Sequence, residues 1–218
     1  MSLFAIFFSS WIIGFSGAAS PGPVSTFCLT EGARRGFWAG PRITLGHALI
    51  ELIMVALLAV GLAPILQLPA VIGLIALIGG VFLLWMGWGL LRGAWTGRIV
   101  LDLDARAQPS GILRLGSVPA GAVISLSNPY WFFWWATIGV NYVLAAIAFG
   151  LFGLVAFYLG HILADLTWNS LMTFIASSGR RVLSPAFYRW LLILFGLFLL
   201  IFGAGFVVKG LGDLRFIL

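Results

Sequence analysis

Long apolar runs dominate this sequence and decide in which solvent it can fold. Hydrophobic residues make up 62% of the 218 residues and charged residues only 8%, whereas soluble globular proteins carry about 25% charged residues. A run of about 20 apolar residues is long enough to cross a bilayer as a helix. We therefore expect an all-α integral membrane protein that is in contact with the lipid bilayer. Six transmembrane helices are expected, at residues 3–30, 39–63, 70–93, 116–140, 145–176 and 187–210.

The first apolar run is expected to stay in the protein as a span. It lacks the basic segment that begins a secretory signal, and its apolar character continues past Pro23. The one cysteine, Cys28, excludes an internal disulfide and a CxxC redox motif. No P-loop, HExxH or GxSxG motif is present, so the sequence does not indicate an enzyme.

Basic residues give the chain a net charge of +6, but they lie in short gaps between the apolar runs. In that position they set the orientation of a membrane protein, so nucleic acid is not an expected partner. The gaps after the first, third and fifth helices hold three, four and three of the twelve Lys and Arg residues. The positive-inside rule therefore predicts a cell-membrane protein with these gaps in the cytoplasm and both termini outside.

The two halves of the chain repeat the same motifs in the same order. Three helices in each half is an odd number, so the second half would enter the membrane from the opposite side, as in many secondary transporters. We expect two inverted three-helix repeats, at residues 1–95 and 116–218, joined by a cytoplasmic linker at 96–115. The motif pairs are residues 20–23 with 127–129, 46–51 with 160–165, and 82–89 with 198–205.

The second motif pair places an acid inside each half's second helix. Glu51 and Asp165 lie near mid-membrane, where a charge costs about 2.5–3.5 kcal/mol on insertion scales. His47 and His161 precede them by four residues and share their helix faces. The acids are candidates for carrying a proton or binding a substrate amine. The histidines either relay that proton or only orient the acids.

The same four side chains are also a candidate metal site. Two imidazoles and two carboxylates form an N2O2 donor set for a divalent cation, provided that the second and fifth helices face each other. The sequence leaves this as an alternative, and no resident cofactor is expected.

The first motif pair predicts that the first and fourth helices are broken. Pro21 and Pro23, on either side of Gly22, remove two backbone donors, and Pro129 removes one after Asn128. In lipid, the freed carbonyl groups must find partners within the protein or line a cavity. These stretches are therefore candidates for binding a substrate, although simple kinks are the alternative.

Further polar and aromatic candidates lie beside these motifs. Ser20 adjoins the first break, and Asn169 is four residues after Asp165 and shares its face. Six consecutive aromatic residues, 130–135, follow the second break. They are expected to form either a wall of the substrate path or an interfacial belt.

Taken together, these motifs give the chain a resemblance to the LysE/RhtB family of amino-acid exporters. The resemblance covers nearly the whole chain and implies a six-helix, proton-coupled exporter of amino acids. It rests on Ser20-Pro21-Gly22-Pro23, on Glu31-Gly32-Ala33-Arg34-Arg35-Gly36, on Leu45-Gly46 with Glu51, and on Ser127-Asn128-Pro129.

Two features depart from the family pattern. Exporters of basic amino acids tend to carry an aspartate shortly after the Asn-Pro motif, where this chain has Trp134 and its aromatic neighbours. His47 and His161 are not part of the common pattern, and the wider superfamily includes metal-ion transporters. The main expectation is a secondary-active exporter of amino acids or related small solutes.

Three further expectations complete the sequence-based interpretation. The alternative substrate is a divalent metal cation. A homodimer is expected because six short helices leave little protein to enclose a pathway. A membrane-embedded oxidoreductase or scaffold subunit is a third possibility, and the single cysteine with no haem-ligand pattern argues against its redox form.

Overall fold

The computed structural model describes residues 2–20, 22–96, 115–178 and 185–215, and every regular element in these ranges is a helix. Within these ranges, five helices are long and apolar enough to cross a membrane, or six when one sharply bent pair counts as a single span. The all-α membrane fold is therefore confirmed. The expected linker at 96–115 falls almost entirely outside the described residues, as does Pro21.

The first expected span consists of two helices, as the proline motif predicts. α1 (Leu3–Ala18) and α2 (Pro23–Arg35) meet at an angle of 83°. The break forms because Gly22 is extended (φ −166°) and Pro23 occupies the first helical position, where its missing N–H is not needed.

The fourth expected span, at 116–140, needs correction. It is divided into α6 (Ser117–Leu126) and α7 (Pro129–Trp134), and α7 continues through a π-helical turn, η3 (Trp135–Gly139), into α8 (Val140–Ile147). The break at Asn128 was expected, but the gap around Asn141 was not correct. The Asn141 amide donates to the Thr137 carbonyl within the helix, so it does not interrupt it.

The connection to the next helix lies later in the chain. The turn comes just before Gly150, whose φ of +62° suits a residue without a side chain. α9 therefore runs over Gly150–Ser177, and not from 145 as expected.

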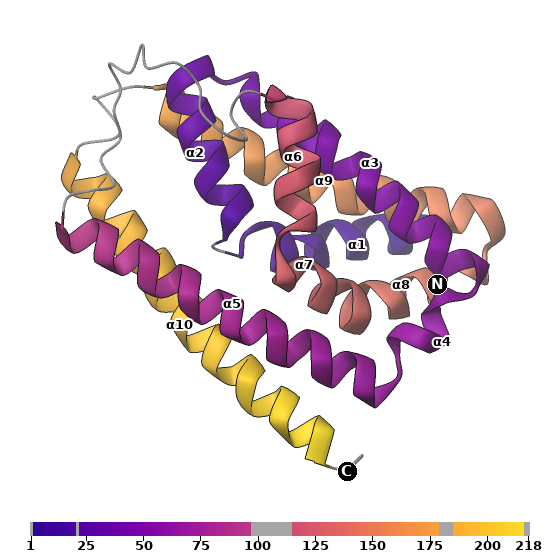
Figure 1. The fold of residues 1–218 in the computed structure, drawn as a ribbon. Coiled ribbons are helices and arrows are strands. Elements are labelled where there is room, and N and C mark those ends of the chain that lie inside the picture. The colour runs from indigo at the N-terminus through magenta and orange to yellow at the C-terminus, as the bar shows by residue number, and fades with distance from the viewer. Residues whose placement is uncertain (1, 21, 97–114, 179–184, 216–218) are drawn as a thin grey trace.

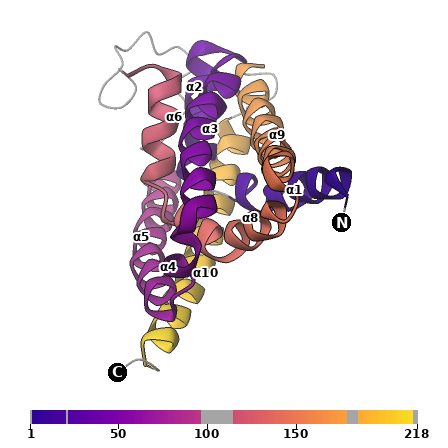
Figure 2. The ribbon, with the colours of Figure 1, turned by 90° about the vertical axis from the view of Figure 1, so that its right-hand side faces the viewer.

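The remaining spans match their expected positions closely. α3 (Ala39–Leu57) is followed by a π-helical turn, η1 (Leu58–Leu62), which is kinked at Gly61 (φ +124°), and then by α4 (Ala63–Leu66). α5 (Pro69–Thr96) and α10 (Pro185–Arg215) run side by side over most of their length (Figures 1 and 2).

Glycines allow α5 and α10 to approach closely. A Cβ atom at Gly87 would lie 2.8 Å from the Gly196 carbonyl oxygen, and one at Gly203 would lie 2.9 Å from the Gly80 carbonyl oxygen. Gly87 and Gly203 therefore permit close packing of the two helices. Gly89 and Gly205 have no such role among the described residues, because no described atom lies within 4 Å of a Cβ there.

Two other helix crossings position the site. α3 crosses α6, and α1 crosses α9 (Figure 1). A Cβ at Gly46 would overlap the backbone carbonyl of Val118 on α6, and one at Gly160 would overlap that of Phe7 on α1. The repeated glycine thus serves the same packing purpose in both halves. That the two halves are inserted in opposite directions stays a prediction.

Candidate functional site

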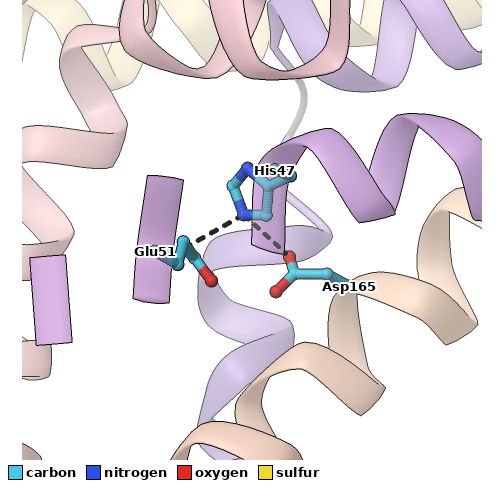
Figure 3. A group of neighbouring side chains, drawn as sticks. All are labelled: His47, Glu51 and Asp165. Atoms are coloured by element: carbon cyan, nitrogen blue, oxygen red, sulfur yellow. Dashed lines mark ion pairs between the residues drawn. The ribbon is translucent and has the colours of Figure 1, made fainter. Parts of the chain in front are cut away.

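The two repeated histidine–acid pairs meet in the interior between α3 and α9. We call His47, Glu51, His161 and Asp165 the acid–imidazole cluster. All four side chains are buried, with exposed fractions of 1–8%. Figure 3 shows His47 between Glu51 and Asp165, which approach it from the two helices. The condition for a shared site, that the second and fifth spans face each other, is therefore met.

Each imidazole contacts the acids of both helices. His47 Nε2 lies 3.0 Å from Glu51 Oε1 and 3.6 Å from Asp165 Oδ1. His161 Nε2 lies 3.2 Å from Glu51 Oε2 and 3.7 Å from Asp165 Oδ2. Glu51 thus receives the closer contact from both histidines.

Two tryptophans that the sequence did not single out as ligands also hold Glu51. The indole N–H groups of Trp131 and Trp135 donate to Glu51 Oε1 at 3.0 and 3.1 Å. A tryptophan pair four residues apart shares a helix face, and this spacing was the available signal. Trp134 stacks on the His161 ring, with ring centroids 4.5 Å apart. The aromatic run therefore forms a wall of the site.

A serine of α6 fixes the second nitrogen of His47. His47 Nδ1 lies 2.7 Å from Ser125 Oγ, and the Ser125 hydroxyl donates to the Gly121 carbonyl at 2.7 Å. With that hydroxyl proton already used, His47 Nδ1 is the donor to Ser125. In this tautomer Nε2 of the neutral imidazole carries no proton, and it faces the Glu51 carboxyl. A hydrogen bond between the two groups therefore needs one added proton, which they share. This arrangement is suited to taking up and releasing protons.

A small cavity opens beside the cluster at the break between α1 and α2. The centre of a water molecule can occupy about 40 Å³ of it, and one water needs roughly 10–15 Å³ on this measure. The space therefore suits a small polar solute. Its walls are Gly17, Ala18, Ser20, Gly22, Val24, His47, Glu51, Asn128, Tyr130, Trp131, Trp134, His161, Asp165 and Asn169.

The cavity brings together most of the residues that the sequence predicted for the site. Ser20, Gly22, Asn128 and Asn169 line it together with the acid–imidazole cluster. Asn128 also accepts a hydrogen bond from Tyr130 N at 3.1 Å and so begins α7.

The prolines predicted for the site do not line the cavity where the structure describes them. Pro23 and Pro129 begin α2 and α7 and are not among the lining residues, and the Pro129 ring packs against Gly79 of α5. Pro21 lies outside the described residues. The prolines for which positions are described therefore shape the breaks and do not contact the cavity.

A divalent cation also has a possible donor set here. One ligand atom each from His47, Glu51 and Asp165 lies within 4.8 Å of the others, and His161 Nε2 faces the same Glu51 carboxyl. Imidazole and carboxylate together suit zinc and similar ions. In the structure these atoms already pair with one another at 3.0–3.7 Å, so a bound cation would replace a shared proton.

Comparison with known proteins agrees with this architecture. The chain is 29% identical over 211 residues to a protein of Bacillus subtilis named putative amino acid efflux protein YcgF, covering 96% of this chain and 98% of the relative. It is 30% identical over 169 residues to the chemotactic transduction protein ChpE of Pseudomonas aeruginosa, with 76% and 79% covered.

A shorter match is to the arginine exporter protein ArgO of Pectobacterium carotovorum, 30% identical over 100 residues, with 45% of this chain and 48% of the relative covered. No solved structure matches the chain. The sequence profile described as LysE type translocator matches residues 15–210, and the chain belongs to this family.

Proposed function

We propose that this protein is a secondary-active exporter of amino acids or related small solutes, driven by the proton gradient. The observation that carries the proposal is the acid–imidazole cluster beside a small cavity at the break of α1 and α2. The full-length relative named a putative amino acid efflux protein supports the substrate class.

The coupling follows from the chemistry of the cluster. The four side chains from α3 and α9 are buried, so the energy of a proton or a cationic group there depends strongly on which groups are paired. A proton and a substrate ammonium would compete for this cluster. Alternating access would arise as the two three-helix halves move against each other around the cluster.

Reconstitution into proteoliposomes tests the proposal. We expect labelled amino acids to be transported, and transport to rise when a pH gradient is imposed. Glu51→Gln should abolish the response to the gradient because it removes the carboxyl that both histidines contact. Asp213→Asn is the matched control, since this acid of α10 pairs with Lys209 outside the site.

Two results would contradict the proposal. Absence of transport for a broad amino-acid panel would exclude the substrate class. Transport by Glu51→Gln with an unchanged response to the gradient would remove Glu51 from the mechanism.

Export of a divalent metal cation is the second candidate, because three donor atoms of the cluster lie within 4.8 Å of one another. Zinc or cobalt should then bind tightly to the purified protein, and His47→Ala should remove that binding. Thr167→Val, on the exposed side of α9, is the control. Zinc binding that survives His47→Ala would exclude this candidate.

The proposal also covers the orientation of the protein in the membrane and its oligomeric state. The protein would lie in the inner or plasma membrane with both termini outside, as the distribution of basic residues predicts. It would act as a homodimer. Cysteine-accessibility labelling of each terminus in intact cells checks the orientation, and mass measurement of the detergent-solubilised protein checks the assembly.

A further inference from the structure

The two acids of the cluster are unequally paired. Glu51 is held by the indole N–H groups of Trp131 and Trp135 and by the Nε2 atoms of both histidines, all within 3.0–3.2 Å of a carboxylate oxygen. Both indole N–H groups and His47 Nε2 meet at Glu51 Oε1, while Glu51 Oε2 lies 3.2 Å from His161 Nε2 and is otherwise without a hydrogen-bond partner among the described residues. Glu51 is therefore held in place through Oε1.

Asp165 lies in the same cavity without such partners. Its nearest ring nitrogens are 3.6 and 3.7 Å away, beyond good hydrogen-bonding distance. Its Oδ2 atom is buried and has no hydrogen-bond partner among the described residues. Leaving a buried acceptor unpaired costs about 1–3 kcal/mol, more when it is charged. This oxygen therefore marks a position for a donor that the protein itself does not supply.

The missing donor is best supplied by a cationic ligand. Among the described residues, no Lys or Arg lines the cavity. The two imidazoles there are nearer to Glu51 than to Asp165. A primary ammonium group brings a positive charge and three N–H donors, which is what Asp165 lacks.

A second part of the cavity favours the opposite charge. Gly22 and Val24, at the start of α2, belong to its wall, and no side chain of the described residues caps this 13-residue helix. Free N–H groups and the helix dipole at such an end attract carboxylates. Together with Asp165, the cavity thus offers one site for an ammonium group and one for a carboxylate.

We propose that Asp165, and not Glu51, is the ligand of the substrate ammonium group, while the start of α2 receives the substrate carboxylate. Glu51 then acts as a positioning residue that keeps both histidines and both tryptophans in place. The inference rests on the proposed function and names the chemistry of the substrate, an α-amino acid bound as a zwitterion.

Equilibrium binding to the purified protein in detergent tests this assignment. The probes are L-alanine, L-lactate, which lacks the ammonium group, and ethylamine, which lacks the carboxylate. The unmodified protein should prefer L-alanine over both. Asp165→Asn should weaken L-alanine binding by roughly 10- to 100-fold, since it removes one charged hydrogen-bonding contact, while L-lactate binding stays unchanged. Asp165→Glu should recover part of the preference.

Controls separate this inference from the proposed function. Asp213→Asn should bind all three probes as the unmodified protein does. Glu51→Gln should lower the unfolding temperature while keeping the preference for L-alanine over L-lactate. If Glu51→Gln does not fold, the two Asp165 variants still decide the question. Equal L-alanine affinity in Asp165→Asn and the unmodified protein would overturn the inference. Binding and transport of no amino acid by the unmodified protein would instead overturn the proposed function.

Discussion

The α3–α6 and α1–α9 crossings share a packing arrangement but differ in their polar contacts. At the first crossing, His47 Nδ1 is bonded to Ser125 of α6. At the second, His161 Nδ1 is buried with no partner among the described atoms, and the nearby residue of α1 is Gly14. The repeated glycine and histidine therefore reproduce the backbone approach, whereas the facing helix decides which groups are satisfied.

Side-chain length adds a second difference between the halves. Glutamate is one methylene longer than aspartate, and the Glu51 carboxyl makes closer contacts with both histidines than the Asp165 carboxyl does. The repeated motif therefore carries one carboxylate in close contact with both histidines and one that lies farther from them.

The largest effect on stability is expected from Glu51→Gln. Removing one member of a buried ionic network costs about 3–5 kcal/mol because its partners stay buried, whereas Asp165→Asn removes only long contacts. Thermal unfolding in detergent should show a decrease of roughly 6–20 °C for Glu51→Gln at 2–4 °C per kcal/mol, and a much smaller one for Asp165→Asn. Equal decreases would remove the distinction between the two acids.

The next largest effect is expected at the two helix crossings. Gly46→Ala and Gly160→Ala each place a methyl group against the backbone of the facing helix, and overpacking of this kind costs about 1–3 kcal/mol. Gly89→Ala is the control, because a Cβ there meets no described atom within 4 Å. Thermal unfolding should separate these variants. If Gly160→Ala is as stable as Gly89→Ala, the two crossings are not packed alike.

Ser125→Ala should make the α3–α6 crossing resemble the α1–α9 crossing, where the histidine Nδ1 has no partner among the described atoms. It leaves His47 Nδ1 without a partner, at a cost of about 1–2 kcal/mol. Ser127→Ala is a matched control at the C-cap of α6: the Ser127 hydroxyl also donates to a carbonyl four residues earlier, but the residue is exposed. Unfolding temperature and the pH dependence of transport should both change only for Ser125→Ala. No difference between the two variants would mean that the Ser125 contact is unimportant.

The smallest effect is expected from Thr44→Val. Thr44 Oγ1 accepts a hydrogen bond from Asn169 Nδ2 at 3.1 Å and so joins α3 to α9. Because Asn169 lines the cavity, water can replace the lost partner, and the cost should stay near 0.5–1 kcal/mol. Thr167→Val is the control on the exposed face of α9. A decrease in unfolding temperature as large as that of Glu51→Gln would show that this link, too, holds the halves together.

Much of the fold could be predicted because the bilayer constrains the backbone so strongly. The apolar runs predict the spans, since a helix in lipid must satisfy its own hydrogen bonds. Pro23 and Pro129 predict the two breaks, because proline inside a helix removes a backbone hydrogen bond and clashes with the preceding turn. The gap at Asn141 was wrong because an amide side chain can bond the preceding turn of its own helix, and so a polar residue does not by itself end a span.

The sequence alone therefore supplies the spans, the breaks and the repeated acids, all of which follow from local chemistry and from the cost of polar groups in lipid. The tertiary structure alone decides that Glu51 and Asp165 share one cavity, that Trp131 and Trp135 bind Glu51, and that Asp165 Oδ2 is left without a donor. These contacts join residues about 80 to 115 positions apart. They depend on which helix faces meet, which no local sequence pattern determines.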